Sequence, residues 1–154
     1  MMFDQILGLP AHPLIIHAAV ILIPLLAVGS VVYGAVPRVR PSIGWAVVLL
    51  AIAAPAAAFA AKESGEAFFD GMFAGGLPEG ALGARITEHQ SYANPLLLSA
   101  VGLGVSSLLL VYSARKLGRI TTVVLTVVTV LLALAAGFYV LRAGHTGATA
   151  VWAR

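Results

Sequence analysis

The residues of this sequence best suited to chemistry are its four histidines, His12, His17, His89 and His145. Neutral imidazole is the commonest protein ligand for metals and suits zinc, copper and iron. The chain has no cysteine, which excludes disulfides, thiolate metal sites, iron–sulfur clusters held by this chain and covalently attached haem. The chemistry that remains is the binding of a metal ion, or of a haem b whose iron is held by histidines from two helices.

No other catalytic pattern accompanies the histidines. The sequence contains no phosphate-binding loop, nucleophile elbow or metalloprotease motif, and no carboxylate lies within an apolar run. It therefore offers no nucleophile or general acid, and we expect an electron carrier or binding protein rather than an enzyme. The net charge of +3 resides in short loops without interleaved aromatic residues, so nucleic acid is not an expected partner.

The composition shows which elements must position the histidines. Hydrophobic residues make up 60% of the 154 residues and charged residues only 10%, and the mean hydropathy is +1.01. Soluble domains carry about 25% charged residues, so this chain could not cover a surface that faces water. We therefore expect lipid to cover it.

Four apolar runs are each near the ~20 residues that cross a hydrocarbon core of ~30 Å. They cover residues 13–36, 43–61, 95–112 and 120–141, and residues 62–94 connect the second to the third. The sequence thus predicts one all-α transmembrane domain over residues 1–154, an integral membrane four-helix bundle. We expect the first run to be a retained helix and not a cleaved signal, because Met1–Asp4 contains no basic residue.

The charges predict the orientation of the bundle. The connections after the first and third runs contain only basic charged residues: Arg38, Arg40, Arg115, Lys116 and Arg119. Every acid lies before the first run or in the long connection: Asp4, Glu63, Glu66, Asp70, Glu79 and Glu88. The positive-inside rule places the basic connections in the cytoplasm. Both termini and residues 62–94 are then expected outside the bacterial cytoplasmic membrane.

Small residues are frequent in the runs, as in residues 51–58 and 133–137. In lipid, helices associate through close packing of small residues, so a compact bundle is expected. The two helix hairpins show no strong internal repeat in sequence.

All four histidines fall at the expected outer face. His12 precedes Pro13, and His17 lies about 7.5 Å further along that helix and about 140° around it. His89 lies on an expected outer extension of the third helix, and His145 follows Gly144 at the end of the fourth. His17 is the one histidine inside a run, where an ionisable residue normally faces the bundle.

These positions predict a b-type haem near the outer face, with electron transfer as its function. Four histidines would suffice for two haems; with one haem, His17 and His89 are the predicted axial ligands and His12 and His145 lie near its edge. Cations near this face could bind the propionates: Lys62, Arg85 and Arg142. Two alternatives remain open, a zinc or copper site built from the same histidines and a cofactor-free anchor or assembly subunit of a respiratory complex.

The long connection offers further candidates. Glu63 and Glu66 could act as hydrogen-bond partners of imidazole, although a solvated helix end also explains them. An apolar stretch follows, with Phe68, Phe69, Met72 and Phe73, which favours an interfacial anchor or a cap over the bundle and leaves a quinone pocket open.

Several short motifs resemble a known family. These are Gly8-Leu9-Pro10-Ala11-His12-Pro13 with His17 and Pro24, Glu63-Ser64-Gly65, Glu88-His89 and Gly144-His145-Thr146-Gly147-Ala148. Over nearly its whole length the chain is similar to the bacterial membrane proteins grouped as domain of unknown function 2231.

The resemblance implies a four-helix membrane protein and marks the four histidines without saying what they bind. Some members are fused to Rieske-type domains, which implies association with electron transfer. This chain has no Rieske pattern, so a Rieske or cytochrome partner would be a separate chain. A homo-oligomer is left open.

Overall fold

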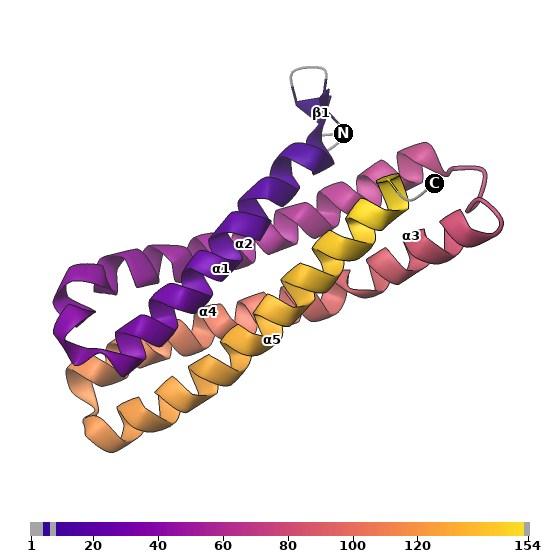
Figure 1. The fold of residues 1–154 in the computed structure, drawn as a ribbon. Helices are drawn as coiled ribbons and strands as arrows, with labels where there is room; N and C mark the ends of the chain where they lie inside the picture. Colours follow the sequence, from indigo (N-terminus) through magenta and orange to yellow (C-terminus); the bar gives the residue numbers. More distant parts are fainter. Residues whose placement is uncertain (1–4, 7–8, 153–154) are drawn as a thin grey trace.

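A computed structural model describes residues 5–6 and 9–152 of the chain (Figure 1). Its elements in order are β1 (Gln5–Ile6), β2 (Leu9–Pro10), α1 (Ala11–Ala35), the 3-10 turn η1 (Pro37–Val39), α2 (Arg40–Met72), α3 (Ala81–Ser91), α4 (Ala93–Lys116) and α5 (Arg119–Trp152). The two-residue strands pair antiparallel. Asp4 of the orientation argument, the rest of Met1–Asp4, and Gly8 of the opening motif lie outside the described residues.

Four helical segments in this part of the chain are long and apolar enough to cross a membrane. They are His12–Ala35, Pro37–Met72, Ala81–Lys116 and Arg119–Ala150, the third combining α3 and α4, which only Tyr92 separates. The predicted all-α four-helix membrane fold is confirmed.

The helices are longer than the apolar runs. The second run ends at residue 61, whereas α2 continues to Met72, and α5 continues past residue 141 to Trp152. Ala, Lys and Glu, which follow the second run, are good helix formers and keep the backbone helical. Hydropathy marks where the expected lipid contact ends, and the helix continues beyond that point.

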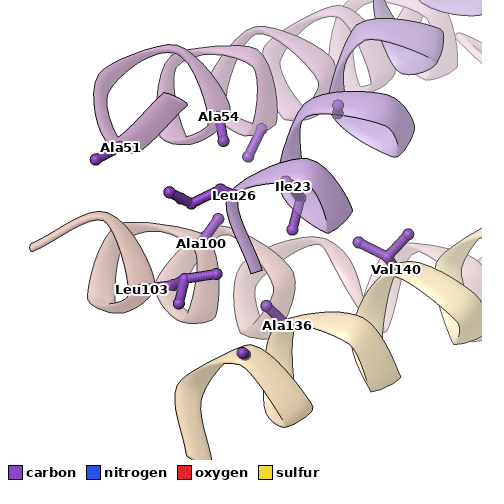
Figure 2. Packing of buried hydrophobic residues seen from close by; sticks show 11 residues of the cluster. Ile23, Leu26, Ala51, Ala54, Ala100, Leu103, Ala136 and Val140 are labelled. Carbon is purple, nitrogen blue, oxygen red and sulfur yellow. The ribbon is translucent and has the colours of Figure 1, made fainter. Parts of the chain in front are cut away.

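The bundle interface is built from small and aliphatic side chains spaced three and four residues apart. On α2 the buried stripe contains Gly44, Val47, Ala51, Ala54 and Ala58. Figure 2 shows Ala51 and Ala54 of this stripe among side chains of the other helices, including Ile23, Leu26, Ala100, Leu103, Ala136 and Val140. Small residues allow the close approach that drives helix association in lipid.

Large apolar side chains point away from the bundle. Leu98, Ile120 and Leu141 are each more than 70% exposed. A water-facing surface would not carry so many such groups, whereas a lipid-facing surface requires them. Small side chains inside the bundle and large apolar side chains on its surface support the membrane assignment independently of helix length.

Buried hydroxyls join the helices to one another. Ser30 of α1 hydrogen-bonds to Ser107 of α4 at 2.8 Å. Near the α4–α5 turn, Ser113 and Thr122 hydrogen-bond at 3.0 Å. Such bonds between helices add specificity to an interface of otherwise interchangeable apolar contacts.

At Gly104, α4 lies directly against the backbone of α2. A Cβ there would lie 2.6 Å from the carbonyl oxygen of Ala51 and 2.9 Å from Cγ of Pro55. Pro55 lacks the N–H that would otherwise bond to the Ala51 carbonyl four residues earlier. The helix defect and the glycine therefore face each other, and the Gly104 backbone covers the freed carbonyl.

Replacing Gly104 with alanine should force α2 and α4 apart. We expect G104A to lower the free energy of unfolding by about 1–3 kcal/mol, as overpacking does elsewhere. Denaturant titration in detergent, followed by far-UV circular dichroism, measures this change. The matched control is Gly137→Ala, where an added Cβ meets nothing within 4 Å. Equal stability of the two variants would show that the close approach is not a constraint.

Candidate functional site

A cavity of about 750 Å³ opens at one end of the bundle. Its walls come from the first turns of α1, the last turns of α2, α3, the start of α4 and the end of α5, which gather at the same end in Figure 1. The lining is mostly apolar, and on α2 it continues the buried stripe with Ala61, Gly65, Phe68 and Met72. Space exists because alanines and glycines stand where larger side chains would fill the interface.

His12 enters the cavity from α1 with its orientation fixed. Its Nδ1 lies 3.1 Å from Oγ of Ser64 on α2, and Ser64 is fully buried. The Ser64 hydroxyl donates to the carbonyl of Ala61 at 3.0 Å, so its oxygen is left to accept from Nδ1–H. Phe68 stacks beside the imidazole with ring centroids 6.1 Å apart. This arrangement favours the Nδ1–H tautomer, in which Nε2 carries a lone pair.

His89 enters the cavity from α3 in the same way. Its Nδ1 lies 3.2 Å from Oγ1 of Thr146 on α5, which is also buried. The Thr146 hydroxyl donates to the carbonyls of Arg142 and Ala143 at 2.8 and 3.3 Å. The oxygen again accepts from Nδ1–H, and Nε2 is again the nitrogen with the lone pair.

A glycine follows each hydroxyl residue and lies against the imidazole. A Cβ at Gly65 would be 3.0 Å from Cε1 of His12, and one at Gly147 would be 3.1 Å from Cε1 of His89. Both contacts are tighter than ordinary van der Waals contact. Glycine therefore lets each ring lie directly on the neighbouring helix.

The two half-sites are thus built alike from different hairpins. Residues 61–65 and 143–147 share the pattern Ala-x-x-Ser/Thr-Gly. In each segment the hydroxyl residue hydrogen-bonds to a histidine on the other arm of the same helical hairpin. The sequence shows no strong repeat along the helices, yet at the site the hairpins repeat one another. This short pattern is the signal that could have identified Ser64 and Thr146 as partners of the histidines.

The result is a pair of imidazoles in one apolar cavity. His12 and His89 are half-buried, and both line the cavity. Among the described residues, neither Nε2 makes a hydrogen bond. Two nitrogens with available lone pairs therefore belong to one site.

The other two histidines lie outside this cavity. His17 is exposed on α1 and its Nδ1 contacts the carbonyl of Pro13, while His145 is exposed on α5. Five residues turn a helix by about 140°, so His12 and His17 cannot both face the bundle. Likewise His145 points away because its neighbour Thr146 points inward. The structure pairs His89 with His12, where the sequence-based hypothesis pairs it with His17.

The cations expected near the site are already engaged or lie elsewhere. Lys62 lines the cavity, and its Nζ lies 2.6 Å from Glu66 and 3.6 Å from Glu63. These two carboxylates therefore bind Lys62 and not an imidazole. Arg142 does not line the cavity; it donates to the hydroxyl of Tyr92.

The remaining predicted residues have different positions. Arg142 also pairs with Glu88 at 3.1 Å, which joins α5 to α3. Arg85 is half-buried on α3 and does not line the cavity. The apolar stretch of the long connection does line it, with Phe68, Phe69, Met72 and Phe73.

No group of three or more His, Asp or Glu side chains in the described part of the chain is arranged to hold a metal ion. A zinc site usually takes three or four protein ligands. The cavity histidines, His12 and His89, offer two ring nitrogens.

Comparison of the chain with family models, with curated proteins and with solved structures found no match.

The hydrogen bonds predict the tautomers of the two histidines. In the protein labelled with ¹⁵N-histidine in detergent, His12 and His89 should both be protonated at Nδ1 at alkaline pH. Ser64→Ala should shift His12 toward a tautomer mixture and leave His89 unchanged, because only the first ring loses its hydroxyl acceptor and keeps the backbone carbonyl of Ala61 alone. Ser64→Thr keeps the hydroxyl and is the control. Long-range ¹H–¹⁵N correlation spectra would contradict the assignment if the wild type showed protonated Nε2 in either ring.

Proposed function

We propose that the cavity binds one haem b between His12 and His89, and that the protein transfers electrons in the bacterial cytoplasmic membrane. The observation that carries this proposal is the pair of imidazoles from two hairpins, each held through Nδ1 by a buried hydroxyl. A ligating histidine normally donates its second ring N–H to such a partner, which fixes the tautomer and orientation of the ring.

The number of ligands favours haem over a bare metal ion. The macrocycle of haem b already provides four nitrogens to the iron, so the protein would need to add only one or two ligands. Two imidazoles are sufficient for that, whereas zinc or copper would need further side chains, and the described residues provide no group of three. Membrane bundles suit this arrangement because facing helices can present one ligand each.

The remaining walls fit a flat apolar ligand. A cavity of about 750 Å³ is within the usual range for cofactor sites. Phe68, Phe69 and Phe73 provide apolar surface, and Gly65 and Gly147 keep the imidazoles close to their helices. Lys62 is the cation on the cavity wall, so it is a better propionate partner than Arg85 or Arg142, provided that it exchanges Glu66 for the propionate.

When bound, haem would supply one-electron redox chemistry. If His12 and His89 both held the iron, the protein would leave no ligand position for oxygen, which favours electron transfer over catalysis. The positive-inside rule supports a position of this site near the outer face, where a separate Rieske or cytochrome chain could exchange electrons. Membership of the domain of unknown function 2231 family remains part of this proposal.

Histidine replacement with spectroscopy tests the ligand pair. Protein purified from a haem-sufficient host should show a sharp Soret band, reducible α and β bands and one haem per chain. His12→Ala and His89→Ala should each lose the low-spin spectrum. His17→Ala and His145→Ala are matched controls and should keep it, because these residues lie outside the cavity.

The outcomes separate the alternatives. A colourless wild type that contains stoichiometric zinc or copper would replace the haem proposal with a metal site. A colourless, metal-free wild type that co-purifies with respiratory subunits would instead support an assembly role. A spectrum lost in His17→Ala and kept in His12→Ala would contradict the ligand pair.

The hydroxyl partners should tune the reduction potential. A hydrogen bond from Nδ1–H makes imidazole a stronger electron donor and stabilises ferric iron. Thr146→Ala should therefore raise the midpoint potential, by an amount on the order of tens of millivolts. Thr146→Ser should restore it. Spectroelectrochemical titration measures this, and an unchanged or lower potential in Thr146→Ala would show that the hydroxyl does not act through His89.

A further inference from the structure

A second cavity, of about 540 Å³, lies at the opposite end of the bundle. It is enclosed by the end of α1, by η1 and the first residue of α2, and by the α4–α5 turn, which lie together at the left of Figure 1. Two of its lining residues are Arg40 and Arg119. None of the residues that hold His12 and His89 lines this second cavity.

Arg40 is positioned by the end of α1. Its Nε and Nη2 donate to the carbonyls of Tyr33 and Gly34 at 3.0 and 2.9 Å, and its guanidinium lies 5.7 Å from the Tyr33 ring centroid. Among the described residues, its Nη1 group makes no hydrogen bond. The side chain is therefore half-buried and fixed, with part of its donor fork still available.

Arg119 stands on the other side of the same cavity, at the first residue of α5. It is exposed, and the first turn of α5 contains no acidic residue. Thr122 and Thr126 below it donate their hydroxyls to the carbonyls of Gly118 and Thr122, so the polar cavity floor is internally satisfied. Among the described residues that line this cavity, Arg40 and Arg119 are therefore the ones with N–H donors left for a ligand, and both side chains are positively charged.

No carboxylate in the described chain offsets this charge. The surrounding cations Arg38, Arg115 and Lys116 are exposed, and all acids of the described residues lie toward the other end, on α2, α3 and the segment between them. A simpler explanation is that these arginines only flank their helices and extend toward water. That explains an exposed arginine, but not one held half-buried in a cavity at the membrane boundary.

We propose that the cavity lined by Arg40 and Arg119 binds the phosphate of an anionic phospholipid. Guanidinium groups bind phosphate oxygens through paired N–H donors. Basic cavities between transmembrane helices are where acidic headgroups bind. A lipid fits better than free phosphate because Val123, an exposed apolar side chain along which an acyl chain would lie, lines the cavity. This inference does not depend on the occupant of the first cavity.

The test compares two arginine replacements that remove the same charge. Arg119 lines the cavity, whereas Arg115 does not. The guanidinium of Arg115 lies beside Gly44 of α2. The full-length protein in zwitterionic detergent is titrated with phosphatidylglycerol, and bound lipid is counted by native mass spectrometry. Arg119→Gln should weaken binding about fivefold, and Arg115→Gln less than about twofold.

Other results would overturn the proposal. Equal losses in the two variants would mean that general surface charge, and not this cavity, attracts the lipid. Equal binding of phosphatidylcholine would mean that no anionic group is selected. Inorganic phosphate alone is titrated in parallel; if it bound with the same dependence on Arg119 and displaced the lipid, the occupant would be free phosphate.

Discussion

The arrangement of the first cavity depends on one interaction made twice: an imidazole N–H donating to a buried hydroxyl on the neighbouring helix. Ser64 holds His12 and Thr146 holds His89. A polar group in apolar surroundings must find a partner, because leaving it unsatisfied costs several times what an ordinary hydrogen bond contributes. That requirement fixes which nitrogen of each ring carries the proton. It also fixes which nitrogen is presented to the cavity.

The membrane core and the cavity are two ends of one helix interface. Along α2, the stripe that packs as Ala51, Ala54 and Ala58 continues as Ala61 and Gly65 against the cavity. Where larger aliphatic residues of the other helices fill the gap, as Leu26 and Leu103 do, the interface is closed (Figure 2). Where small residues meet on two helices with no large partner, space remains. The same short side chains that bring helices together in lipid therefore leave room for a ligand at the end of the bundle.

Much of the fold could be predicted from hydropathy and charge, but the choice of histidines could not. In a helix that is apolar on every side, the pattern does not show which face is buried, so the sequence favours His17 over His12 only because His17 lies inside the apolar run. Buried Ala19, Leu26 and Tyr33 follow His12 at intervals of seven, and only the packed structure reveals that phase. Arg85 and Arg142 are expected near the site from their position at the outer face, whereas neither side chain lines the cavity. The glycine and hydroxyl partners were visible as a short repeated pattern, although their role depends on contacts between helices.

Electron paramagnetic resonance of the oxidised, purified protein would show whether His12 and His89 together hold one iron from the two hairpins. If they do, we expect a low-spin ferric signal typical of two imidazole ligands, equivalent to one iron per chain. A high-spin signal in the wild type, or no haem iron at all, would contradict it.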